Sequence, residues 1–205
     1  GTIVQVGSAL AYRAIPLQSA YCAAKFAMRG FTDSLRSELL HDRIPVHLTM
    51  VQLPAVNTPQ FTWSRLRGFR REPQPVPPIY QPEVAAEGIV FAAHARRREV
   101  YVGGRIPLLI WLNKFLPWAG DRYLAHTGYD SQFTSERVEG ERRDNLDAPL
   151  PGDHGAHGPF DAQSTDRSLQ LAFTRHRGAF GVAAAVGLLI GAWLWADRRG
   201  FGRRR

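Results

Sequence analysis

Two apolar runs on either side of a long helical pattern constrain the fold more than any other feature of this sequence. Residues 1–8 (GTIVQVGS) and 45–53 (PVHLTMVQL) are rich in aliphatic and β-branched side chains without strict alternation, which is typical of strands covered on both faces. Between them, residues 19–41 carry apolar side chains at helical spacing, namely Ala24, Met28, Phe31, Leu35 and Leu39. A strand, a helix and a strand with short connections predict a β-α-β unit with parallel strands.

The next fifty residues continue this pattern. Residues 54–82 contain seven prolines and no clear periodicity, as expected of a lid or binding loop. Residues 83–95 predict an amphipathic helix, and residues 99–102 predict a short strand that ends at two glycines. The first half of the chain is therefore expected to have an α/β fold.

The second half has a different composition. Residues 105–128 predict a helical extension, whose first part either lies in a membrane interface or closes a substrate pocket. Residues 129–177 contain few large apolar side chains and predict a disordered linker. Residues 178–196 carry no charge, and as a helix they would be about 28 Å long, close to the ~30 Å of a bilayer core. We therefore predict a single transmembrane helix here, with a buried soluble helix as the alternative, and an arginine-rich tail over 197–205.

The charge and the cysteine content exclude several kinds of site. The net charge is +8, but 24 of the 26 basic residues are arginine, without a basic face or an aromatic platform, so we expect no nucleic-acid binding. The single cysteine, Cys22, excludes a disulfide framework and a cysteine-based zinc site. Asp153, His154 and His157 lack a fourth ligand and helical spacing, so we expect no metal site.

Three side chains in the first β-α unit carry the most informative pattern. Tyr21 and Lys25 are four residues apart near the start of the expected helix, so their side chains lie one turn apart on one face. A lysine ammonium beside a phenol favours the phenolate, which makes the phenol a better acid and base near neutral pH. Ser8 ends the preceding strand, at the sheet edge where open α/β sheets bind ligands. The alternative is that Tyr21 and Lys25 lie on a solvated helix surface.

These residues resemble a known family. The stretch from Gly1 to Leu39, with Ser8 thirteen residues before Tyr21 and Lys25 four after it, resembles the catalytic segment of the short-chain dehydrogenases/reductases. The resemblance extends over residues 1–104. It implies that this part of the chain is the C-terminal portion of a Rossmann-like, doubly wound parallel sheet.

The resemblance also implies an activity. The family transfers a hydride between NAD or NADP and an alcohol or carbonyl carbon, and we favour NADP here. By resemblance, Tyr21 is the general acid and base, Lys25 holds the nicotinamide ribose, and Ser8 donates a hydrogen bond to the substrate oxygen. The resemblance places further cofactor contacts on the segment VQLPAVNT, at Pro54, Val56 and Thr58, although Ala55 stands where the family has glycine. An apolar small-molecule substrate would be covered by residues 59–80.

The sequence departs from the family at its N-terminus. No glycine-rich phosphate loop opens a helix, and the chain begins at Gly1 with a strand that needs neighbours. We therefore expect that the N-terminal part of a larger catalytic domain is missing, and that this chain alone binds dinucleotide poorly and has no measurable activity. The alternative is a non-catalytic, truncated product or membrane-attached binding module. The expected partners are membrane lipid through 178–196, with the catalytic part on the cytoplasmic side, and a second copy through the helix 19–41.

Overall fold

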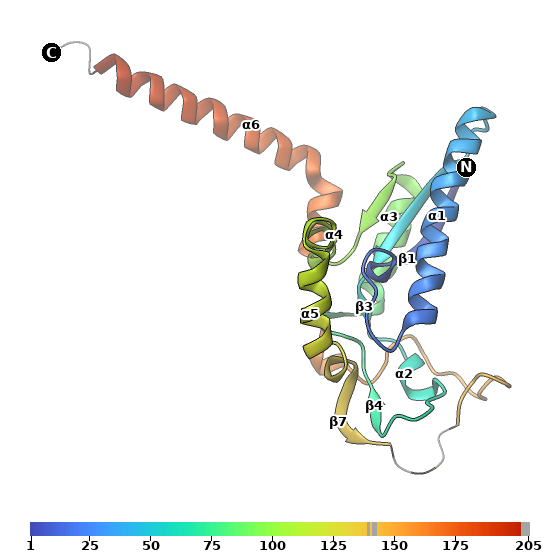
Figure 1. The fold of residues 1–205 in the computed structure, drawn as a ribbon. Coiled ribbons are helices and arrows are strands. Elements are labelled where there is room, and N and C mark those ends of the chain that lie inside the picture. The colour runs from blue at the N-terminus through green and yellow to red at the C-terminus, as the bar shows by residue number, and fades with distance from the viewer. Residues whose placement is uncertain (139, 141–142, 202–205) are drawn as a thin grey trace. The chain divides into compact units, whose positions relative to one another are not determined.

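A three-stranded parallel sheet forms the centre of the structure. The computed structural model describes residues 1–138, 140 and 143–201, and it separates into two units, Gly1–Leu171 and Ala172–Arg205. In the first unit the strands follow the order β1 (Thr2–Ser8), β2 (His47–Leu53) and β6 (Glu99–Tyr101) (Figure 1). The α/β fold and all three strands agree with the sequence prediction.

The strand register brings two predicted site segments to one edge of the sheet. β1 pairs with β2 along its whole length, from Thr2 opposite His47 to Ser8 opposite Leu53. Because the strands are parallel, their carboxyl ends lie at the same edge. Ser8 therefore lies beside the residue that precedes Pro54.

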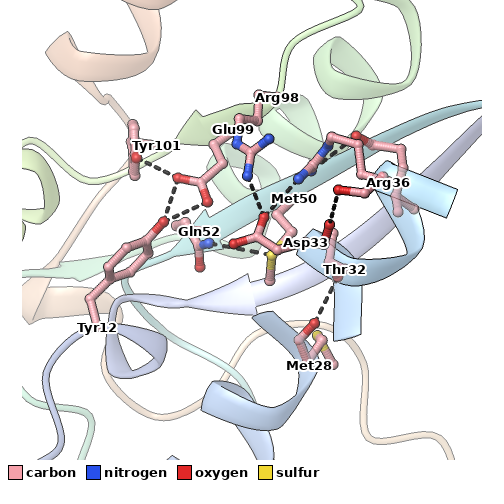
Figure 2. Close-up of polar contacts among 12 residues, drawn as sticks. Tyr12, Met28, Thr32, Asp33, Arg36, Met50, Gln52, Arg98, Glu99 and Tyr101 are labelled. Atoms are coloured by element: carbon pink, nitrogen blue, oxygen red, sulfur yellow. Dashed lines mark hydrogen bonds and ion pairs between the residues drawn. The ribbon is translucent and has the colours of Figure 1, made fainter. Parts of the chain in front are cut away.

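Two helices cover opposite faces of the sheet. On one face Val51 and Val100 are fully buried in a cluster that includes the α3 (Pro82–His94) residues Val84 and Ala92. Packing is so close there that a Cβ on Gly88 would lie 2.5 Å from a methyl carbon of Val102. The side chains of Met50 and Gln52 alternate with Val51 and lie on the face of α1 (Ser19–His41), beside Thr32 (Figure 2).

The helix α1 has the predicted bounds, but the predicted apolar stripe is only partly covered: Met28, Leu35 and Leu39 are half-buried. The predicted stripe included Ala24 and Phe31, both of which are exposed, with Phe31 58% exposed. The buried residues of the helix are Cys22 and Thr32, and Lys25 lies between them on the same face. Polar and small side chains face the sheet because they bond to backbone groups, as Lys25 does with Val6.

Short elements from distant parts of the chain pair beside this sheet. β3 (Ala55–Val56), β5 (Ile79–Tyr80) and β8 (Ser164–Thr165) form a small parallel sheet. β4 (Arg71–Pro73) pairs antiparallel with β7 (Phe133–Arg137). The remaining elements of the first unit are η1 (Ala9–Ala11), α2 (Gln60–Trp63), α4 (Arg105–Phe115), α5 (Pro117–Thr127), η2 (Asp130–Gln132) and η3 (Asp161–Gln163).

The prediction of a disordered linker over 129–177 differs from the structure. This segment contributes β7 and β8, and its acidic side chains pair with the first half of the chain. Arg65 bonds to Asp144 at 2.8 Å, and Asp161 accepts from Asn57 at 2.8 Å. A segment with few apolar residues is ordered here because its polar groups find specific partners, which composition alone does not reveal.

The structure also contradicts the prediction of a transmembrane helix. Residues 178–196 fall within α6 (Leu169–Phe201), which is interrupted by a non-helical residue at His176. Within the residues that the structure describes, no helix is both long and apolar enough to cross a bilayer. Ten of the nineteen residues at 178–196 are glycine or alanine, which add little apolar surface. The side chains at 183–184 and 193–196, like most of the predicted tail 197–205, lie outside that description.

Candidate active site

Lys25 is held between the sheet and Tyr21. Its Nζ donates a hydrogen bond to the backbone oxygen of Val6 at 2.9 Å, two residues before the end of β1. The same Nζ lies 5.5 Å from the centre of the Tyr21 ring. The predicted pairing of Tyr21 with Lys25 is therefore seen in the geometry, and it follows from their spacing of four residues in the first two turns of α1.

Burial changes the properties of this ammonium group. Desolvation lowers the pKa of Lys25 from its usual value. A lysine has three N–H donors, and Val6 accepts one of them, so two remain for other acceptors. Tyr21 is 45% exposed, so a small molecule can reach its hydroxyl. Lys25 therefore offers a positive charge and two donors beside an accessible phenol.

Ser8 occupies the carboxyl end of β1 and is largely buried. Its Oγ accepts a hydrogen bond from the backbone N–H of Leu10 at 3.2 Å and so caps the short helix η1. This contact uses an acceptor site of the hydroxyl and leaves its proton available for donation. In the described chain, no hydrogen bond joins Ser8 to Tyr21.

The loop between Ser8 and Tyr21 is fastened to β6 by a carboxylate that sequence reasoning missed. Tyr12 donates to the Glu99 carboxylate at 2.5 and 2.6 Å, and Tyr101 donates to the same carboxylate (Figure 2). Burial and the bond to Glu99 raise the pKa of Tyr12 to about 12, and the same causes raise the pKa of Tyr101. Both phenols therefore remain protonated donors at physiological pH. The Arg29 guanidinium lies 4.0 Å from the centre of the Tyr12 ring.

Residues from the second half of the chain also form hydrogen bonds with the loop between Ser8 and Tyr21. Arg13 bonds to Asn113 on α4 at 2.9 Å and to Asp121 on α5 at 2.7 Å. Gln132 donates to the backbone oxygen of Pro16 at 2.9 Å and accepts from Gln18. The path of the chain from Ser8 to Tyr21 thus depends on residues that lie about a hundred positions later.

The predicted cofactor-contact segment follows β2 at the same sheet edge. Pro54 packs so closely on Gly103 that a Cβ there would lie 2.9 Å from it. Val56 pairs with Tyr80 between β3 and β5. The backbone of Thr58 lies against Gly158, where a Cβ would approach the Thr58 oxygen to 2.5 Å.

Asn57 connects this segment to the rest of the fold and was missed by sequence reasoning. It is fully buried, and its Oδ1 accepts from the Phe160 backbone N–H at 3.1 Å. Its Nδ2 donates to Gln81 at 3.1 Å and to Asp161 at 2.8 Å. The backbone of Asn57 adds bonds to Tyr80 and Gly158. Asn57 therefore sets the positions of the neighbouring Val56 and Thr58.

The imidazole of His157 interacts with Asp161, one of the partners of Asn57. His157 lies 2.8 Å from the Glu83 carboxylate and 3.4 Å from that of Asp161. These two carboxylates raise the pKa of His157, while the hydrogen bond from Gln81, followed by that from His157, lowers the pKa of Asp161. His157 thus joins an ion-pair network, and the described residues contain no group of three ligands that could hold a metal ion.

The aromatic side chains of the predicted substrate loop pack on the later part of the chain. Phe61 contacts Phe160 with ring centres 5.7 Å apart, and Trp63 contacts His154 at 4.4 Å. An open cavity of about 390 Å³ lies beside Trp63, lined also by residues 145–150 and His154. Neither Ser8 nor Tyr21 lines this cavity.

The sequence of this chain is similar to those of several known proteins. Residues 1–65 match the family model described as short chain dehydrogenase. The "Uncharacterized oxidoreductase YxnA" of Bacillus subtilis is 30% identical over 205 residues, which cover 97% of this chain and 54% of that protein. SadH of Mycobacterium tuberculosis is 50% identical over 115 residues, which cover 50% of this chain and 40% of that protein.

A third relative has a more specific name. Human "Estradiol 17-beta-dehydrogenase 11" is 30% identical over 127 residues, which cover 61% of this chain and 38% of that protein. The chain spans about half the length of the curated relatives it matches, or less.

Proposed function

We propose that the protein is an oxidoreductase that uses Tyr21, Lys25 and Ser8 to interconvert an alcohol and a carbonyl compound, as the match of residues 1–65 to the short chain dehydrogenase model suggests. One observation carries the proposal. The Lys25 ammonium is fixed on the carboxyl end of β1 by Val6 and lies 5.5 Å from the Tyr21 ring.

The residues present fit the nicotinamide end of NAD or NADP. Lys25 has two free N–H donors, which match a pair of ribose hydroxyls, and the segment from Pro54 to Thr58 follows the neighbouring strand at the same edge of the sheet. When bound, the cofactor would supply the hydride acceptor or donor. Lys25, Pro54, Val56 and Thr58 would hold it.

The chain's own residues would move the proton. Tyr21 takes a proton from the substrate hydroxyl during oxidation and returns it to the carbonyl oxygen during reduction. Lys25 would place its positive charge beside the phenolate that accepts the proton in oxidation and that remains after reduction. Ser8, whose Oγ is fixed by the Leu10 N–H, donates to the substrate oxygen as charge develops on it.

We further propose an apolar substrate. The loop that follows the cofactor-contact segment carries the aromatic residues Phe61, Trp63 and Phe69, whose rings would offer apolar surface to such a substrate. The name of the human relative identifies a steroid substrate for that protein, which makes hydroxysteroids a reasonable first group to assay.

The Ser8→Ala variant, made in the whole protein that the gene encodes, tests the proposal. The expected result is a loss of about a hundredfold in kcat/KM, because a donor to the developing oxyanion is removed. The assay follows reduced nicotinamide absorbance with NAD or NADP and a panel of hydroxysteroids and aliphatic alcohols. Ser37→Ala, an exposed serine on α1, is the matched control and should retain wild-type activity. Equal activity of both variants would contradict the role of Ser8.

A further inference from the structure

An exposed apolar stripe runs along α4 and into α5. The outward side chains of α4 recur at spacings of three, four and seven residues, which place them on one face of the helix. The stripe consists of Leu108, Trp111, Leu112, Phe115, Leu116 and Trp118, which are between 44% and 64% exposed. The opposite face of α4 packs on the fold through Ile106, which is 3% exposed, and through Asn113. A contiguous apolar surface of this kind marks an interaction site.

Basic residues accompany this stripe. The Lys114 ammonium lies 5.9 Å from the Trp111 ring centre, and the Arg122 guanidinium lies 5.3 Å from that of Trp118. Arg105 opens α4. The segment from Arg105 to Thr127 contains one acidic residue, Asp121, which is paired with Arg13. The face therefore combines tryptophan, phenylalanine and leucine with positive charge.

We propose that the stripe on α4 and α5 is the surface by which this protein lies on a membrane that contains anionic lipids. Leucine and phenylalanine would enter the boundary of the acyl chains, and tryptophan would lie at headgroup level. Lys114 and Arg122 would extend to the lipid phosphates, since long basic side chains keep their charges at the polar boundary. The contact is interfacial, and α4 does not cross the bilayer.

Charge complementarity favours lipid over a second copy of the chain. In a two-fold symmetric contact the same patch meets itself, so the positive charges of Lys114 and Arg122 would face a patch whose one carboxylate, Asp121, is already paired with Arg13. Like charges at such a contact are unfavourable. An anionic lipid surface satisfies both the apolar and the basic side chains of the stripe at once.

Flotation of the full chain with lipid vesicles tests the proposal. The wild type should float with vesicles of phosphatidylcholine and phosphatidylserine, and more weakly with phosphatidylcholine alone. Trp111→Ser with Phe115→Ser should lower vesicle affinity about tenfold or more, because two side chains that enter the bilayer are lost. Lys114→Gln with Arg122→Gln should reduce only the preference for phosphatidylserine, by about fivefold for each basic residue.

The matched control is Phe26→Ser with Phe31→Ser, which removes two exposed aromatic side chains from α1. This variant should float like the wild type. Circular dichroism should show that all variants remain folded. Wild type that does not float, or equal flotation of the Trp111 and Phe115 variant and the wild type, would overturn the proposal. So would a lipid-free dimer that the same variant dissociates, since a second copy would then cover the stripe.

Discussion

Tyr21→Phe is expected to lower kcat/KM of the oxidoreductase reaction by about a thousandfold, because it removes the only group proposed to exchange a proton with the substrate oxygen. The substitution removes one oxygen and keeps the ring that lies beside Lys25. Tyr21 is 45% exposed, and no hydrogen bond involves its hydroxyl in the described residues, so folding should not change. Steady-state kinetics with either nicotinamide cofactor measures the effect.

Tyr129→Phe is the matched control for this variant. Tyr129 is 52% exposed and lies just before η2, outside the proposed site. It should retain wild-type kcat/KM, and both variants should unfold at the wild-type temperature. If Tyr21→Phe keeps activity within a factor of about three of the wild type, Tyr21 is not the acid and base.

Asn57→Ala is expected to lower the free energy of unfolding by about 3 kcal/mol, because it removes a fully buried side chain and leaves the buried Phe160 N–H without its acceptor. The Phe160 N–H loses its acceptor, and Gln81 and Asp161 lose the donor Nδ2. Chemical denaturation followed by circular dichroism measures the change. The same variant should raise the KM for the cofactor, since Thr58 would no longer be held in place.

Asn145→Ala provides the control for Asn57→Ala. Asn145 is exposed, and its backbone N–H donates a hydrogen bond to the Trp63 oxygen, which the substitution retains. Its free energy of unfolding should stay within about 0.5 kcal/mol of the wild type. A similarly small change for Asn57→Ala would show that the network around Asn57 does not hold this segment.

The sequence predicted the elements that local patterns encode. The bounds of β1, β2, α1, α3 and β6 agree with the prediction within about two residues, because each has a clear period or apolar run and a proline or glycine near its end. The pairing of Tyr21 with Lys25 was also predictable, since helical spacing alone brings these side chains together.

Long-range polar contacts could not be predicted in this way. The bond between Asn57 and Asp161 joins residues more than a hundred positions apart, and nothing near either residue identifies its partner. The same holds for Glu99 with Tyr12. Such contacts order the 129–177 segment, whose composition had suggested disorder. The predicted membrane span was wrong, since no helix in the described part of the chain is long and apolar enough to cross a bilayer.

The central claim is that Tyr21 and Lys25 act as one proton-transfer unit, and a double-mutant cycle tests it most directly. The cycle compares kcat/KM for the alcohol or carbonyl substrate in the wild type, Tyr21→Phe, Lys25→Met and the double variant, at saturating cofactor so that the role of Lys25 in holding the ribose does not enter. Groups that act as a unit give strongly non-additive losses. The account predicts that the double variant loses no more than about the thousandfold of Tyr21→Phe alone. If the losses of the two single variants multiply in the double variant, the two residues act independently and the account is contradicted.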